Sequence, residues 1–148
     1  MNNSFQDTFS YKLIYVFGIN SKSHGGLLKI GEATISGISN FHIINDNSEE
    51  LNKAAKLRID DYTKTAGINY ELFYTTLAIT NDNKPFRDND VHAVLKRSNI
   101  IQPKQKLNGA LEWFKTDLST VIKAINAVKQ GKTSLHPSEV TKDKTPII

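Results

Sequence analysis

The sequence predicts an α+β fold: a small three-stranded antiparallel sheet flanked by helices, in the order β-β-α-β-α-α. Three observations lead to this class. Two short runs rich in β-branched and aromatic residues, 11–18 and 27–33, stand on either side of a turn-forming segment. A third run of the same kind, 69–79, follows a stretch with helical periodicity. Two more helix-like segments come after it.

The first two runs are expected to pair as an antiparallel hairpin. Residues 11–18 read YKLIYVFG, and their Tyr, Ile, Val and Phe residues favour a strand. Residues 20–26, NSKSHGG, supply the Asn, Ser and Gly of a turn. The second strand, 27–33, reads LLKIGEA and contains Gly31. Residues 34–48 are rich in Ser, Gly and Asn and are expected to form an inserted loop.

A helix over 47–67 and a strand over 69–79 follow. Asn47 or Ser48 can cap the helix, because a short polar side chain accepts a hydrogen bond from an N–H group of the first turn. Gly67 is expected to end it, as glycine commonly does at a helix C-terminus. The strand, NYELFYTTLAI, has strong β propensity.

Two further helices are predicted after this strand. Residues 80–85, TNDNKP, form a turn, and a short helix, DNDVHAVLKRS, begins at Asp88. Residues 112–131, EWFKTDLSTVIKAINAVKQG, are expected to form the closing helix, because their apolar positions follow the helical period and a glycine ends them. The domain is thus predicted to span 1–131, with the polar segment 132–148 as a linker or tail leading to a further domain of a longer chain.

Composition and charge exclude several classes of function and are compatible with others. The 148 residues suit one domain, and the formal net charge of +4 is compatible with a polyanionic partner such as DNA or RNA. The chain has no cysteine, which excludes disulfides, thiolate metal sites and cysteine nucleophiles, and a reducing cytoplasm is the expected location. No apolar run approaches the ~20 residues of a membrane helix, so no membrane partner is expected. Phosphate-binding glycine loops, HExxH and GxSxG are also missing.

An arginine stands out in the first helix. At 100° per residue, Leu51, Ala54, Ala55 and Tyr62 are expected on one apolar face, with Arg58 in its middle. Either the stem of the arginine packs and its head reaches solvent or a carboxylate, or the guanidinium binds a phosphate, which its planar fork suits. Periodicity alone favours the first interpretation.

The short helix after the third strand carries an acid and a histidine one turn apart. Asp88, Val91, His92 and Leu95 share one face, so the carboxylate and the imidazole can reach the same cation or substrate. In the simpler interpretation, which the spacing alone favours, Asp88 caps the helix and His92 is a half-buried surface residue. Asp90 points elsewhere and is expected to serve the helix N-terminus.

The order of these pieces resembles the GIY-YIG nuclease superfamily. LIY at 13–15 stands where that family has GIY, and KIG at 29–31 stands where it has YIG. Arg58 lies in the helix that follows, and RDNDVH, 87–92, opens the helix after the third strand. EWF at 112–114 is similar to the Glu-Trp-Phe signature of the phage-type branch. The resemblance covers about residues 10 to 130 and implies a GIY-YIG-like fold.

The resemblance implies a metal-dependent DNA endonuclease that hydrolyses phosphodiester bonds. Tyr15 would orient or deprotonate the attacking water with the help of Lys29, and Arg58 would hold the scissile phosphate. Asp88, in the position of a family glutamate, would bind Mg²⁺ or Mn²⁺, and His92 would support it.

Two residues are assigned supporting roles by the same resemblance. Gly31 would let backbone and substrate approach closely, and Glu112 would brace the site. The chain also resembles amino-terminal modules fused to DEAD-type helicases in restriction or phage-defence systems, which implies a helicase domain in the same full-length chain. Two alternatives stay open: a catalytically weakened DNA-binding or regulatory module of the same fold, and a protein-interaction domain.

Overall fold

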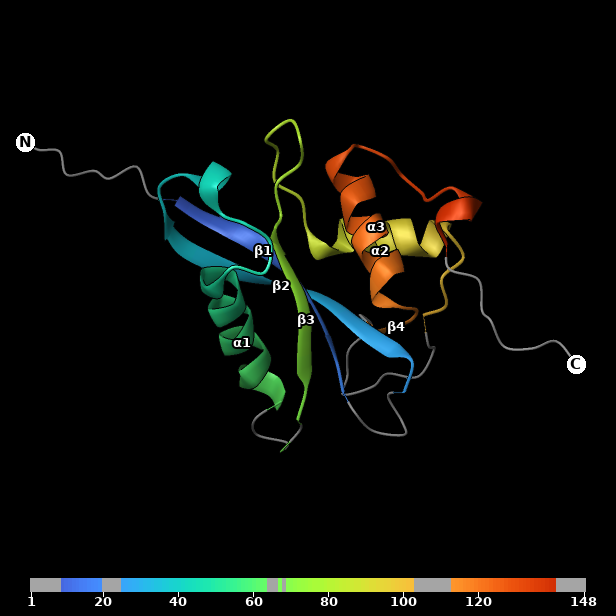
Figure 1. Cartoon of the computed structure of the whole chain (residues 1–148), viewed down its shortest axis with the longest axis horizontal. Helices are drawn as coiled ribbons and strands as arrows, with labels where there is room; N and C mark the ends of the chain where they lie inside the picture. The colour runs from blue at the N-terminus through green and yellow to red at the C-terminus, as the bar shows by residue number, and fades with distance from the viewer. Residues whose placement is uncertain (1–8, 20–24, 64–66, 68, 103–112, 141–148) are drawn as a thin grey trace, which may run out of the picture.

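The computed structural model describes residues 9–19, 25–63, 67, 69–102 and 113–140 (Figure 1). Within these residues the chain forms four strands and three α-helices in the order β1-β2-α1-β3-α2-β4-α3, with two short 3₁₀ helices, η2 and η3. The predicted α+β class with an antiparallel sheet is confirmed. Across the described part of the chain, every helix is too short or too polar to span a bilayer.

The sheet has the strand order β3-β1-β2-β4. The predicted hairpin is present: β1 (Phe9–Gly18) pairs antiparallel with β2 (Leu27–Ile38). On its other side β1 pairs with β3 (Glu71–Leu77), also antiparallel. The short strand β4 (Trp113–Lys115) pairs with the start of β2. β1 and β2 are therefore the central strands, and they carry the two sequence motifs of the hairpin.

The helix α1 (Glu49–Thr63) packs on one face of the sheet. Ser48 caps it, since the Ser48 hydroxyl accepts a hydrogen bond from the Leu51 N–H at 3.3 Å. The buried residues of this face form one core, made of Leu13, Tyr15, Phe17, Ala33, Ile35, Ile38, Leu51, Ala55, Ile59, Leu77 and Trp113.

The helices α2 (Asp88–Arg97) and α3 (Leu118–Lys129) pack against each other and cover a second core. Figure 1 shows α1 on one side of the molecule and the α2–α3 pair on the other, with the strands between them. This second core takes the opposite side chains of the central strands, including Ile14, Val16, Leu28 and Ile30, together with Phe114 of β4 and with Val91, Leu95, Val121 and Ile125.

The predicted count of three strands is wrong, because β4 lies inside the predicted closing helix. Trp113 and Phe114 are adjacent and both buried, yet they belong to different cores. Only an extended chain points successive side chains to opposite faces, so this pair forms a strand. The helix begins later, where the Asp117 carboxylate accepts a hydrogen bond from the Thr120 N–H at 2.8 Å.

Two other segments differ from the predicted loop and tail. β2 continues through Ile38, and η2 (Phe41–Ile43) follows it, so the segment 34–48 is not a plain loop. Beyond α3, Leu135 is buried against the α2–α3 core, and η3 (Pro137–Glu139) lies beside it in sequence. The division of the chain at residue 131 remains a prediction.

Candidate functional site

Tyr15 and Gly31 face each other across β1 and β2. They are register partners, and the Tyr15 ring lies directly over the Gly31 backbone. A Cβ atom added at Gly31 would lie 2.5 Å from the Tyr15 hydroxyl oxygen and 2.6 Å from Cζ. Tyr15 itself is only 2% exposed. Glycine at this position therefore makes room for the phenol, which is a role in folding as well as a feature of the motif.

Lys29 lies on the same face of β2 as Gly31, because side chains two residues apart point the same way. The residue is 5% exposed, and its Nζ atom lies 5.8 Å from the centroid of the Phe17 ring. The Phe17 ring is in turn 5.9 Å from the Tyr15 ring. The phenol and the amine that sequence reasoning grouped together thus share one face of the sheet, the face covered by α1.

Arg58 lies on α1 but not at the centre of its apolar stripe. That stripe is formed by Leu51, Ala55 and Ile59, which are fully buried, so the interpretation that put Arg58 in its middle is wrong. The three residues are spaced four apart, and four residues at 100° each turn by 400°, so the stripe shifts by about 40° from one residue to the next. Arg58 therefore lies at the edge of the stripe. The residue is exposed, as the first of the two interpretations expected.

Asp88 opens α2 next to Glu32 of β2. The Asp88 N–H donates to Glu32 Oε1 at 3.0 Å, and Asp88 is 7% exposed. Arg87 clamps the same carboxylate: its Nε donates to both oxygens at 2.8 Å, and its Nη2 donates to Oε2. Arg87 occupies the N-cap position, so a capping role for Asp88 is wrong. Asp90 serves the helix N-terminus as expected, accepting from the Arg87 N–H at 2.8 Å.

The Glu32 carboxylate is held ionised. Burial would raise its pKa, but hydrogen bonds from the Arg87 side chain and from the backbone and side chain of Asp88 outweigh burial, so the pKa falls from 4.5 to about 2. Lys12 adds a positive charge, with Nζ 3.8 Å from Glu32 Oε2. A fixed negative charge therefore stands one residue after Gly31, on the opposite face of the strand.

His92 reaches the middle of the KIG motif. Its Nε2 atom lies 2.7 Å from the carbonyl oxygen of Ile30, and the residue is 6% exposed. A carbonyl can only accept, so Nε2 carries the proton and donates it. The ring also packs 5.3 Å from the Phe114 ring. His92 is thus more buried than the half-buried surface histidine of the simpler interpretation.

Residues 29–32 of β2 are the point at which most of these groups meet. The Tyr15 ring covers Gly31, the His92 ring binds the Ile30 carbonyl, and the Asp88 backbone binds Glu32. The phenol and Lys29 belong to the α1 face, whereas α2, which carries Asp88 and His92, packs in the other core. The structure therefore joins the predicted groups through the backbone of one strand.

The acids beside α2 fit a magnesium ion in part. Mg²⁺ prefers oxygen ligands and is usually held by one or two carboxylates with several waters. Asp88 and Glu32 provide two neighbouring carboxyl groups, of which Glu32 is held ionised. Among the described residues, however, no group of three or more His, Asp and Glu side chains is arranged around a common centre. Two neighbouring acids, one of them already bound by Arg87, supply only part of the ligand set of a divalent cation.

The sequence analysis did not identify Glu32 and Arg87 as site residues. It also gave a supporting role to Glu112, which the structure does not describe. Glu32 follows the KIG motif directly, and Arg87 precedes Asp88, so an acid after the strand glycine and a cation before the helix acid were the available signals. Glu112, predicted to brace the site, lies outside the described residues. Its neighbour Trp113 is 3% exposed in the α1-face core and is the register partner of Lys29.

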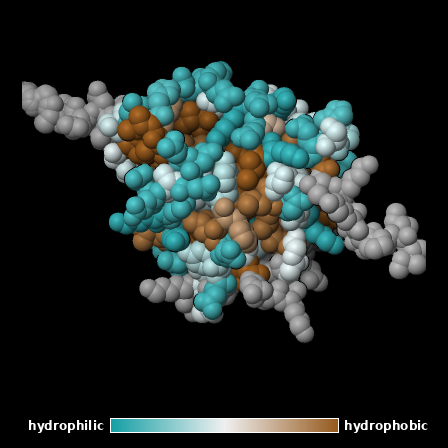
Figure 2. All heavy atoms as spheres, in the orientation of Figure 1, coloured by the Kyte–Doolittle hydropathy of each residue, from teal (hydrophilic) through white to brown (hydrophobic). Residues whose placement is uncertain are grey.

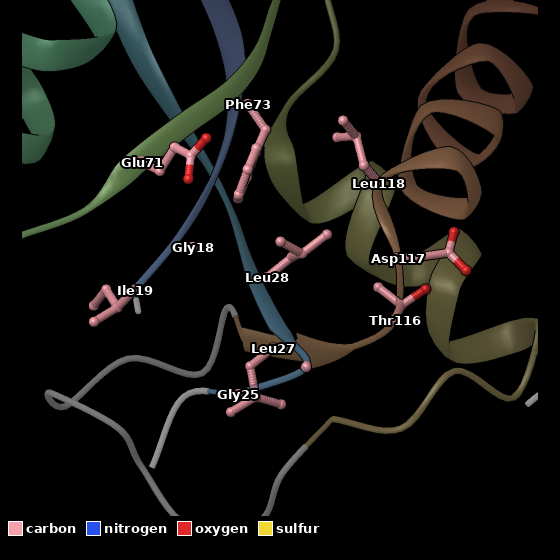
Figure 3. Close-up of a pocket in the computed structure, with 11 residues that line it drawn as sticks. Gly18, Ile19, Gly25, Leu27, Leu28, Glu71, Phe73, Thr116, Asp117 and Leu118 are labelled. Atoms are coloured by element: carbon pink, nitrogen blue, oxygen red, sulfur yellow. The ribbon is translucent and has the colours of Figure 1, made fainter. Parts of the chain in front are cut away.

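A separate cavity of about 450 Å³ opens where β1 ends and where β2, β3 and α3 begin (Figure 3). Its lining is mostly apolar, with the side chains of Ile19, Leu27, Leu28, Phe73 and Leu118 around it. Glu71 and Asp117 also line it, and none of the described residues of its lining is a lysine or arginine. Two acids and no cation disfavour a phosphodiester there, so this cavity is a poor substrate site for a nuclease.

Comparison with known proteins gives no match: no protein-family model, curated protein or solved structure is similar to this chain.

Proposed function

We propose that this chain is a metal-dependent DNA endonuclease that hydrolyses phosphodiester bonds, with a GIY-YIG-like fold of the phage-type branch. The observation that supports the proposal is that residues 29–32 of β2 are contacted by Tyr15 from the α1 face of the sheet and by Asp88 and His92 from the α2 face. The second resemblance, to helicase-fused modules, adds a helicase domain in the full-length chain, and the lack of cysteine is compatible with a cytoplasmic location.

In this proposal, different residues of the chain have different roles in hydrolysis. A phosphodiester resists attack because its anionic oxygens repel the nucleophile, so the site must orient a water and offset negative charge. The Tyr15 hydroxyl orients or deprotonates the water, with Lys29 on the same face of the sheet. The exposed guanidinium of Arg58 binds the scissile phosphate in a bidentate fashion.

Asp88 and the neighbouring Glu32 are the residues that would hold Mg²⁺ or Mn²⁺. When bound, such an ion supplies charge neutralisation at the phosphate and the leaving oxygen. His92 keeps the start of α2 in place by donating to the Ile30 carbonyl, and so fixes the position of Asp88 one turn earlier. Glu112 keeps the supporting role that the resemblance gives it.

A second candidate function is a catalytically weakened DNA-binding or regulatory module of the same fold. The burial of two assigned residues favours it: Tyr15 is 2% exposed and Lys29 is 5% exposed. A water and a phosphate reach those groups only if the covering side chains move. The Asp88 backbone and side chain also bind Glu32, which competes with a metal for the same carboxylates.

A cleavage assay separates the two functions. Plasmid and branched DNA are incubated with Mg²⁺ or Mn²⁺ and with wild-type protein, Arg58→Ala or the matched variant Lys56→Ala, which also removes an exposed cation from α1. The nuclease predicts cutting that Arg58→Ala abolishes and Lys56→Ala retains. Binding that persists while neither metal supports cutting by the wild-type protein would establish the non-catalytic module. Absence of binding to any nucleic acid at low salt would leave a protein-interaction domain.

A further inference from the structure

Two adjoining cavities lie at the opposite end of β3 from the cavity of Figure 3. The first, of about 250 Å³, is lined by η2, by the turn after β3 and by Lys129 of α3; we call it the lysine cavity. The second, of about 390 Å³, is lined by Tyr11 and Lys12 of β1 and by Pro85; we call it the tyrosine cavity. Both are lined by Phe41, Ile79 and Asn83, so they share a wall. Figure 1 shows η2 beside the turn after β3.

The shared wall belongs to a row of three aromatic rings. The Phe41 ring centroid lies 4.2 Å from the His42 ring and 5.5 Å from the Tyr11 ring. The Asn40 side chain accepts a hydrogen bond from the His42 N–H at 3.0 Å and caps η2, which fixes the pair. Figure 2 shows apolar atoms at the surface over η2, in the upper left of the view. Half-exposed rings such as Tyr11 and Phe41, and an exposed ring such as His42, are the platforms on which unpaired bases stack.

The floor of the lysine cavity is a fixed set of donors and acceptors. Asp46 accepts hydrogen bonds from the Thr76 hydroxyl at 2.6 Å and from the Tyr74 hydroxyl at 2.8 Å. Lys129 Nζ donates to Thr76 Oγ1 at 2.6 Å and lies 3.9 Å from Asp46. Burial lowers the pKa of Lys129, and the charge of Asp46 opposes that effect. Because cation and anion offset each other here, the floor suits a neutral ring with polar edges better than an isolated phosphate.

Cations stand around the cavities, where a sugar–phosphate chain would pass. Lys12 Nζ donates to Thr34 Oγ1 at 2.9 Å beside the tyrosine cavity. Lys84, on the turn after β3, has a side chain that is 76% exposed and lies 3.7 Å from Asp82. The exposed Lys84–Asp82 pair is worth little, so a phosphate can replace Asp82 as the partner of Lys84.

We propose that these two cavities receive two successive unpaired bases of a single-stranded nucleic acid, one on each side of the Phe41 ring. Two adjoining cavities that share an aromatic wall match consecutive bases of a strand better than a free mononucleotide, which fills one. The site goes beyond the proposed nuclease function, since holding unpaired bases requires no hydrolysis.

The test uses oligonucleotides that carry 2-aminopurine, whose fluorescence falls when the base stacks on an aromatic ring. The full chain, without added metal, is titrated against labelled single-stranded DNA, single-stranded RNA of the same sequence, the DNA duplex and a mononucleotide. We expect quenching with a single strand and not with the duplex, and the DNA and RNA arms identify the source of the bases. His42→Ala, which changes an exposed residue, and Phe41→Leu, which keeps the apolar packing, should each weaken binding about tenfold to a hundredfold.

Ile43→Ala is the matched control, because Ile43 lies in the same short helix, is 70% exposed and is not among the residues that line either cavity. It should bind like the wild type. Equal quenching by duplex, binding of the mononucleotide alone, or wild-type affinity in the folded His42→Ala variant would each overturn the proposal. Plasmid cleavage with Mg²⁺ by the wild type is measured in parallel, so quenching without cutting, or cutting without quenching, makes failure of the nuclease proposal separable from failure of this one.

Discussion

Replacing Gly31 by alanine tests the central contact of the candidate site. The new Cβ atom would lie 2.5 to 2.7 Å from the hydroxyl, Cζ and Cε1 atoms of Tyr15, whereas ordinary carbon contacts are about 3.5–4.0 Å. The ring must therefore move by roughly 1 Å. Tyr15 is 2% exposed and packs near Phe17, so it cannot turn out to solvent without opening the core. Overpacking of this kind costs about 1–3 kcal/mol.

A double-mutant cycle isolates the clash. Urea denaturation would give the free energy of unfolding for wild type, Gly31→Ala, Tyr15→Ala and the double variant. If the ring is the obstacle, Gly31→Ala should cost about 1–3 kcal/mol in the wild-type background and less than about 0.5 kcal/mol once Tyr15 is alanine. Equal costs in the two backgrounds would refute the argument, because the penalty would then come from the strand itself and not from the phenol.

Three further outcomes are expected. Glu32→Gln should destabilise the fold at neutral pH by about 1–3 kcal/mol, as loss of hydrogen bonds to a charged group does. The depressed pKa of about 2 means that this stabilisation is present above the ordinary carboxyl pKa of 4.5 and is lost as pH falls towards 2, so wild-type and variant stabilities should converge in acid, as measured by urea denaturation across pH. Asp117→Ala should cost about 1 kcal/mol in thermal unfolding through loss of the α3 cap, and an unchanged midpoint would contradict that role. Lys29→Met, which keeps the length of the side chain and removes its charge, should abolish any cleavage in the plasmid assay; cutting at the wild-type rate would contradict a role of the amine in hydrolysis.

Much of the sheet could be predicted because its strands follow local rules. The hairpin of β1 and β2 was marked by β-branched runs and a Gly-rich turn, and Ser48 marked the start of α1. β4 could not be predicted in the same way. It is three residues long, and its evidence is non-local: Trp113 and Phe114 separate into two cores only once both faces of the sheet have been assembled.

The candidate site was harder to predict because helical periodicity shows which face of a helix a residue lies on, but not how deeply its side chain is buried. Arg58 lies only about 60° from Ala55 at the middle of the α1 stripe, and it is exposed. Spacing grouped Asp88 with His92 correctly on α2, but it could not show that their nearest partners are Glu32 and the Ile30 carbonyl of another strand. Contacts between residues more than fifty positions apart depend on the fold as a whole.

The contact of Tyr15 with Gly31 explains how one short motif can serve folding and chemistry together. Glycine lets the phenol lie flat on the strand, and that position fixes the hydroxyl without a side chain beneath it. The next residue, Glu32, ties the same strand to the start of α2 through Asp88 and Arg87. A change at Gly31 would therefore displace the phenol and disturb the strand that positions the acid. Loss of activity in Gly31→Ala alone would not establish a catalytic role, whereas loss in Tyr15→Phe with unchanged stability would.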